Sequence, residues 1–274
     1  MQDNSFEGLR AKFKSQINSA IKAPISNLIG QLGPLPLDKK SNIVQRRHLA
    51  DKLLIDLGET KLLDDIHPEL IPIELAGDNH GRDLITRLIS DKAGNTDELL
   101  MVEIGSFLGG SALRWAKVSP KCRVIAIDPW ANDHTDYLKN IFTDPSKQSM
   151  LSNLSEKDFL AALHYLKKNG SLGFAKQVTY NYPNISLVRS QSPAFLLSLY
   201  FRQVYPDIIY FDSDKQCHDI ELAISIFPGS TICGDDYLWL DDNRVNPIKN
   251  FLNSRVKNFH NLVTSNGQSW ILSD

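Results

Sequence analysis

Three aspartates follow two apolar runs in the second half of the chain and could form one metal site. Asp212 comes directly after Ile208–Phe211, while Asp235 and Asp236 come shortly after Thr231–Cys233. If both runs are neighbouring parallel strands, they lie about 4.8 Å apart, and the acidic side chains converge at one edge of the sheet. Unpaired carboxylates would repel one another, and oxygen ligands that leave room for a substrate suit magnesium better than zinc. The alternative is that each aspartate only caps a strand end or is solvated.

A lysine and a histidine close to this cluster could remove a proton from a substrate. Lys215 lies three residues after Asp212, and His218 lies three residues further on, on the same face of a predicted helix. A base at neutral pH requires the pKa of Lys215 to fall by roughly three units from about 10.4. We expect Lys215 to be the base and His218 to be the second candidate, although an exposed lysine at a helix start is the ordinary alternative. Tyr237 and Trp239 are expected to line the acceptor site or, alternatively, only to pack.

A glycine-rich loop after another apolar run predicts a ligand-binding turn. Leu99–Ile104 is followed by Gly105, and Gly109 and Gly110 come before helix-forming residues resume. Absent side chains let the backbone approach a ligand at the carboxyl end of a strand. The spacing G-x-x-x-G-G departs from the dinucleotide fingerprint, because Phe107 stands where the second glycine would admit the phosphates. A nicotinamide cofactor is therefore disfavoured.

Hydroxyl and carboxylate groups around this loop indicate a nucleoside without phosphates. Ser106 and Ser111 add hydrogen-bond donors, and Asp128 ends the next apolar run, where it could accept hydrogen bonds from two ribose hydroxyls. S-adenosylmethionine is the commonest ligand of this kind, so we expect it here. The alternative is a glycine that only follows a buried strand and an acid that only caps a helix.

These motifs, in this order, resemble the magnesium-dependent class I O-methyltransferases typified by catechol O-methyltransferase, with bacterial relatives that methylate sugars and antibiotics. The resemblance covers roughly residues 99 to 239 and the end of the chain. Its E-x-G-x-x-x-G-x-S cofactor loop is matched by Glu103, Gly105, Phe107, Gly109 and Ser111, with Ser106 between them. It implies a ribose contact for Asp128 and contacts at the adenine end for Trp130, Gln191 and Ser192.

The same resemblance assigns roles to the three aspartates and to the lysine near them. Asp212, Asp235 and Asp236 match the metal ligands, Asp212 also borders the cofactor, and Lys215 matches the catalytic lysine. Two positions match different subfamilies. The catechol enzymes have Asn where this chain has Asp236, whereas many sugar-modifying relatives have His in place of Lys215.

The alternation of predicted strands and helices indicates an α/β fold, a Rossmann-like seven-stranded doubly wound sheet that closes with an antiparallel β-hairpin at Asn266-Gly267. Residues 1–92 are expected to form a helical extension and residues 93–274 the methyltransferase domain. An insertion at about 131–183, after the second strand, contains a predicted helix from Ser155 to Asn169 and should cover or select the substrate. The apolar stripe from Phe6 to Ile21 favours a homo-oligomer.

Composition restricts the class of protein further. The formal net charge of −2 over 274 residues gives no basic surplus for nucleic acid, and no apolar run reaches membrane-spanning length. Three distant cysteines, Cys122, Cys217 and Cys233, indicate reduced thiols in a cytoplasmic protein. We therefore expect a methyltransferase that uses S-adenosylmethionine and a divalent metal to modify a hydroxyl of a sugar, a natural-product alcohol or a catechol. The alternatives are a Rossmann-type oxidoreductase and a catalytically silent binding module.

Overall fold

The computed structural model describes residues 32–35, 43–57, 70–73, 81–131, 134–144, 154–213, 217–241, 243–255, 261–265 and 268–273. Three expectations concern other residues and lie outside this description: the apolar stripe from Phe6 to Ile21, the side chain of Lys215, and the turn at Asn266-Gly267.

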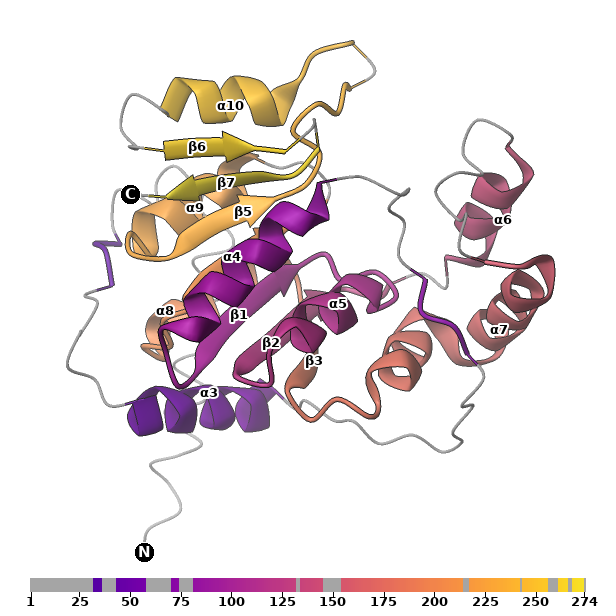
Figure 1. Ribbon diagram of the computed structural model, residues 1–274, viewed down its shortest axis with the longest axis horizontal. Helices are drawn as coiled ribbons and strands as arrows, with labels where there is room; N and C mark the ends of the chain where they lie inside the picture. Colours follow the sequence, from indigo (N-terminus) through magenta and orange to yellow (C-terminus); the bar gives the residue numbers. More distant parts are fainter. Residues whose placement is uncertain are drawn as a thin grey trace, which may run out of the picture.

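A seven-stranded sheet with the order β3-β2-β1-β4-β5-β7-β6 forms the centre of the protein (Figure 1). Its strands are β1 (Leu99–Ile104), β2 (Cys122–Asp128), β3 (Ile185–Arg189), β4 (Ile208–Phe211), β5 (Thr231–Gly234), β6 (Asn261–Thr264) and β7 (Trp270–Ser273). The first five strands are parallel, and β7 pairs antiparallel with both β5 and β6. The predicted Rossmann-like doubly wound sheet with a closing antiparallel pair is therefore confirmed.

Helices cover both faces of this sheet, which explains why β1 is buried along its whole length and apolar except at Glu103 (Figure 1). Successive residues of β1 point to opposite faces, so that Leu100 and Val102 join one core cluster and Leu99 and Met101 join the other. The first cluster includes α3 (Ile43–Leu57), α8 (Ser192–Phe201), α9 (Cys217–Ile226) and α10 (Pro247–Arg255). The second includes α4 (Arg82–Gly94) and α5 (Gly110–Val118).

The segment between β2 and β3 forms a helical lobe beside the sheet, to the right in Figure 1. It contains α6 (Thr135–Thr143) and α7 (Glu156–Thr179), and its side chains form a third apolar cluster together with Ile73 and Leu108. The hydroxyl of Ser155 accepts a hydrogen bond from the backbone N–H of Asp158 and so caps the start of α7. The predicted helix from Ser155 to Asn169 is confirmed. Its regular conformation is interrupted directly afterwards at Gly170, which has φ of 71° and ψ of 175°.

Two helices that precede the sheet pack against it. Ala50, Leu53 and Leu54 of α3 are buried in the core on one face, and Ile85 and Ile89 of α4 are buried on the other. The described part of the expected N-terminal extension is thus built into the same core as the strands. In the described part of the chain, no helix combines the length and the apolar character needed to cross a bilayer.

Candidate active site

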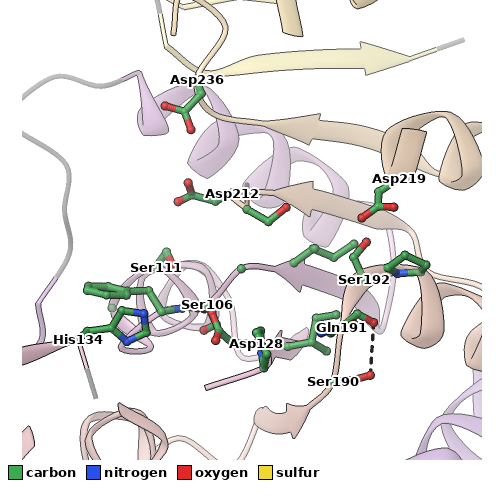
Figure 2. A pocket seen from close by; sticks show the side chains of 18 of the residues that line it. Ser106, Ser111, Asp128, His134, Ser190, Gln191, Ser192, Asp212, Asp219 and Asp236 are labelled. Carbon is green, nitrogen blue, oxygen red and sulfur yellow. Dashed lines mark hydrogen bonds between the residues drawn. The ribbon is translucent and has the colours of Figure 1, made fainter. Parts of the chain in front are cut away.

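A cavity of about 820 Å³ lies at the carboxyl ends of the parallel strands, within the size range of small-molecule sites (Figure 2). The loop after β1 and the first turn of α5 contribute four of the expected cofactor residues to its lining, namely Gly105, Ser106, Phe107 and Ser111. The end of β2 and the segments that follow β3 and β4 contribute four more, namely Asp128, Gln191, Ser192 and Asp212. The fold therefore brings most of the expected cofactor residues to one cavity.

Six expected site residues that the structure describes do not line this cavity, and the buried Asp235 is one of them. Glu103 is fully buried within β1. Gly109 has a left-handed conformation and packs against Ala175 of α7. Trp130 is buried, and its indole N–H donates to the carbonyl of Phe107 at 2.6 Å. The two expected acceptor residues, Tyr237 and Trp239, likewise lie outside the described lining.

Asp128 organises the wall of the cavity at the end of β2. Its Oδ2 accepts the backbone N–H of Phe107 at 3.0 Å, and its Oδ1 accepts the backbone N–H of Trp130 at 2.7 Å. Phe107 and Trp130 both have positive φ, 50° and 40°, so the carboxylate holds two unusual backbone conformations. Burial raises the pKa of Asp128, while these two N–H groups oppose the rise. Each carboxylate oxygen has a second lone pair, so the group can also accept hydrogen bonds from a ligand.

Gly105 is required by the packing of the strand ends as much as by a ligand. It has φ of +90°, and a Cβ atom there would lie 2.2 Å from the backbone oxygen of Asp212. The backbone N–H of Asp212 donates to the carbonyl of Ile104 at 2.8 Å, which keeps the two segments together. A side chain at position 105 would therefore separate the ends of β1 and β4, where the cavity begins.

Glu103 is a buried acid near the end of β1, two residues before Gly105 of the cavity lining. Its Oε1 accepts the indole N–H of Trp115 at 3.0 Å. Burial raises the pKa of Glu103 to about 7, whereas the neighbouring hydroxyls of Ser111 and Ser106 oppose the rise. The group is thus expected to take part in stabilising the fold and to titrate near neutral pH.

Replacing Glu103 by Gln should flatten the dependence of stability on pH. Between the usual pKa of 4.5 and the folded value of about 7, the folded chain keeps a proton that the unfolded chain has lost. The unfolding free energy therefore falls as the pH rises through this window, by roughly 3 kcal/mol at most. Urea denaturation at pH 5 and pH 8 should show this fall in the wild type and not in Glu103→Gln. The exposed Glu156→Gln is the control, and an equal fall in all three proteins would contradict the prediction.

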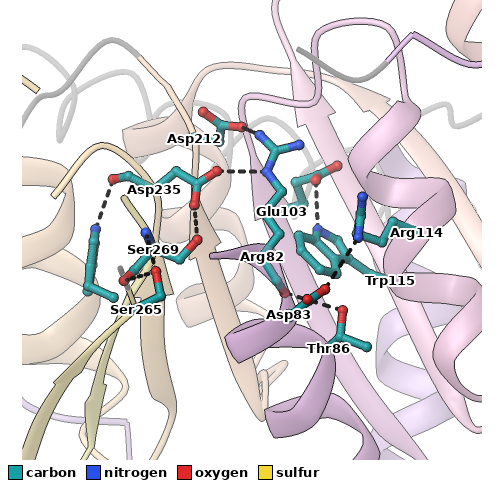
Figure 3. Close-up of polar contacts among 11 residues, drawn as sticks. Arg82, Asp83, Thr86, Glu103, Arg114, Trp115, Asp212, Asp235, Ser265 and Ser269 are labelled. Carbon is teal, nitrogen blue, oxygen red and sulfur yellow. Dashed lines mark hydrogen bonds and ion pairs between the residues drawn. The ribbon is translucent and has the colours of Figure 1, made fainter. Parts of the chain in front are cut away.

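Two of the three acids expected to bind a metal, Asp212 and Asp235, instead bind an arginine (Figure 3). Nη2 of Arg82 lies 2.7 Å from Oδ2 of Asp212, and its Nε lies 2.7 Å from Oδ2 of Asp235. The remaining oxygen of Asp235 accepts a hydrogen bond from the hydroxyl of Ser269. Arg82 and Asp235 are both only 7% exposed. Both oxygens of Asp235 are therefore engaged by donors of the protein.

This arrangement corrects the predicted metal site. β4 and β5 are neighbours, as the sequence indicated, and Asp212 and Asp235 do share one cation. That cation is a guanidinium. Among the described residues, which include Asp236, no three or more His, Cys, Asp or Glu side chains form a group that could hold a metal ion. The donors present therefore do not fit magnesium, and no step of the reaction is assigned to it.

His218 is the expected base that the structure describes. It lines the cavity at the start of α9, and its Nε2 lies 3.4 Å from Oδ1 of the adjacent Asp219. Asp219 is buried, whereas the side chain of His218 is 47% exposed. A carboxylate beside an imidazole can orient the ring, which is a useful arrangement for a base.

Comparisons with known proteins give structural neighbours only. Neither models of protein families nor curated protein sequences match this chain. One solved structure, a Staphylococcus aureus protein assigned as a caffeoyl-CoA O-methyltransferase, is 15% identical with a TM-score of 0.43, over 84% of this chain and 100% of that one. An O-methyltransferase of Bacillus cereus, solved with S-adenosylhomocysteine, is 14% identical with a TM-score of 0.40, over 86% and 94%.

A third neighbour, a methyltransferase of Podospora anserina with bound S-adenosylhomocysteine, is 12% identical with a TM-score of 0.41, over 87% of this chain and 97% of that one. All three are described as methyltransferases. At this level of similarity they assign no role to any single residue, so the roles of the site residues rest on the side chains of this chain alone.

Several cavity residues were not anticipated from the sequence. His134 and Tyr137 come from the inserted lobe and line the cavity beside Phe107, with ring centroids 4.7 Å and 6.0 Å from that of Phe107. Arg82 and Asp219 come from helix starts. A helix start that reaches the carboxyl edge of the sheet is the one signal that could have identified Arg82 and Asp219.

Proposed function

We propose that this chain is a methyltransferase that uses S-adenosylmethionine to methylate a hydroxyl of a small molecule. The observation that carries the proposal is the position of Asp128, which ends β2 at the edge of the cavity beside the glycine-containing loop after β1. In a doubly wound sheet this is where a ribose binds, and a carboxylate there can accept two hydroxyl groups.

The charge of the cavity supports a cationic cofactor. Its described lining has four aspartates, Asp128, Asp212, Asp219 and Asp236, against one arginine, Arg82. This excess of acid opposes a dinucleotide, whose phosphates are negative, and suits a ligand with a sulfonium and an ammonium group. The charge balance thus agrees with the departure of the glycine loop from the dinucleotide pattern.

The other cavity groups suit the remaining parts of this cofactor. The hydroxyl oxygen of Ser192 is buried, lines the cavity and has no hydrogen-bond partner among the described residues. In the proposal, Ser192 and Gln191 contact the adenine end, and Asp212 faces the positively charged methionine end. When bound, S-adenosylmethionine would supply a methyl group already activated by its sulfonium. The chain's own residues then need only align the acceptor and remove its proton.

In this proposal the imidazole of His218 takes the proton of the acceptor hydroxyl, with Asp219 behind it; Lys215 is the other candidate. His218→Ala should lower the release of S-adenosylhomocysteine with a hydroxylated acceptor by about 100-fold or more, without weakening cofactor binding. If turnover is unchanged in His218→Ala and lost in Lys215→Ala, the base is Lys215.

In this proposal His134 and Tyr137 would place the inserted lobe over the acceptor. A homo-oligomeric state and a cytoplasmic location remain predictions from the sequence.

Asp128→Asn should weaken cofactor binding. The amide replaces an acceptor oxygen by a donor, and a hydrogen bond to a charged group contributes about 1.5–3 kcal/mol, which corresponds to at least a tenfold rise in the Kd of S-adenosylmethionine. Isothermal titration calorimetry on the folded protein measures this Kd. Asp91→Asn, exposed on α4, is the control.

Two outcomes of the same titrations favour other functions. Tight binding of NADH, with no heat from S-adenosylmethionine, would identify an oxidoreductase and contradict the proposal. Binding of S-adenosylmethionine without methyl transfer to any hydroxylated acceptor would identify a binding module.

A further inference from the structure

We propose that the guanidinium of Arg82 takes the place of a divalent cation between the ends of β4 and β5, so that this chain needs no metal for methyl transfer. The inference rests on the proposed function for its chemistry and on Figure 3 for its geometry. Two carboxylates that meet at the edge of a sheet need a nearby positive charge to limit their repulsion. Arg82 supplies that charge to Asp212 and Asp235.

The two contacts are geometrically strong. Nε and Nη2 are separate donors on one planar group, and each lies 2.7 Å from a carboxylate oxygen on a different strand end. Charge-assisted hydrogen bonds of this length are among the strongest that side chains form. Because the guanidinium is planar, its two N–H donors keep fixed directions and can point at both carboxylates at the same time. A metal ion could bind Asp212 and Asp235 together only if this guanidinium left its position.

The start of α4 holds Arg82 in place. Gly81, directly before it, has φ of +83°, and a Cβ atom there would lie 1.6 Å from Oγ of Ser265. The hydroxyl of Ser265 accepts a hydrogen bond from the backbone N–H of Ser269, and the hydroxyl of Ser269 donates to Asp235. The start of α4 and the residues between β6 and β7 therefore lie close together beside the Arg82–Asp235 pair. Departure of the arginine would leave the buried Asp235 with the Ser269 hydroxyl but without the positive charge of the guanidinium.

An arginine in this place changes which acceptors the cavity should prefer. A metal ion favours acceptors with two adjacent oxygens, because both can coordinate it. A guanidinium that is already bound to two carboxylates gives an acceptor with two adjacent oxygens no comparable advantage over one with a single hydroxyl. We therefore expect a single hydroxyl to be sufficient, and a vicinal diol or catechol to have no intrinsic preference.

Titration with manganese(II), followed by the electron paramagnetic resonance signal of the free ion, tests the proposal. The wild type is expected to show no bound ion up to millimolar concentration. Arg82→Ala removes the guanidinium and should create one manganese site per chain, which Arg82→Ala/Asp235→Asn should lose. Arg87→Ala, an exposed arginine on the same helix, is the matched control and should bind none. Arg82→Gln is the second variant, to be used if Arg82→Ala does not fold.

Two results would overturn the proposal: one manganese ion bound by the wild type and lost in Asp235→Asn, or a folded Arg82→Ala or Arg82→Gln protein that binds none. The wild-type result is decisive even if both variants fail to fold. Titration of S-adenosylmethionine into the same wild-type sample in EDTA separates this inference from the proposed function. No binding there contradicts the methyltransferase, whereas a bound manganese ion contradicts only the role of Arg82.

Discussion

Gly105→Ala is expected to abolish cofactor binding and to lower the unfolding free energy by about 2–5 kcal/mol. A left-handed conformation costs an L-residue about 1–2 kcal/mol, and a forced core contact costs about 1–3 kcal/mol more. The contact in question is with the backbone of Asp212, at 2.2 Å, which cannot rotate away as a side chain could. Urea denaturation measures the loss of stability, and calorimetry with S-adenosylmethionine on the remaining folded protein measures binding.

Gly94→Ala provides the matched control. An added Cβ atom at Gly94 meets nothing within 4 Å, and this glycine ends α4 on the side remote from Arg82. Gly94→Ala should change the unfolding free energy by less than about 1 kcal/mol and leave the affinity for S-adenosylmethionine unaltered. Wild-type affinity in Gly105→Ala would show that the close approach of β1 and β4 does not shape the site.

Arg82→Ala, without added metal, should lower the unfolding free energy by about 3 kcal/mol. Removal of one partner from a buried ion pair typically costs about 3–5 kcal/mol, because the remaining charge is left buried. We expect a cost at the lower end of this range, because the side chain of Asp212 is 23% exposed and can be partly hydrated. Urea denaturation in EDTA at pH 8 is the measurement.

Arg87→Ala again serves as the comparison, because Arg87 is exposed and on the same helix. Its effect should stay within about 0.5 kcal/mol, as for most surface substitutions. Equal stability of Arg82→Ala and Arg87→Ala would contradict the view that the guanidinium neutralises two acids at the junction of β4 and β5.

The sheet and most of the cofactor cavity could be predicted because their signals are local. The apolar run of β1, required by its burial on both faces, is visible in the sequence of Leu99–Ile104, where Glu103 is the one residue that is not apolar. The end of each strand then specifies which residues reach the carboxyl edge. For this reason Gly105, Asp128 and Asp212 were all expected at one site, and all three line it.

The identity of the cation could not be obtained in the same way. Repulsion among the aspartates correctly indicated that a positive charge lies at the junction, but the side chain that supplies it lies 130 residues before Asp212 and 153 before Asp235. A predicted helix start does not by itself single out Arg82, because its role depends on how the start of α4 meets Ser265 and Ser269, between β6 and β7. The same limitation applies to His134 and Tyr137, whose lobe was expected near the ligand although its packing could not be derived from its sequence.

A crystal structure of the wild type with S-adenosylhomocysteine, grown in the presence of magnesium, tests the central claim most directly. We predict the ribose hydroxyls within hydrogen-bond distance of the Asp128 carboxylate and the guanidinium of Arg82 still between Asp212 and Asp235. A ligand bound away from Asp128 would contradict the proposed methyltransferase. A magnesium ion in place of that guanidinium would contradict the metal-independent reaction.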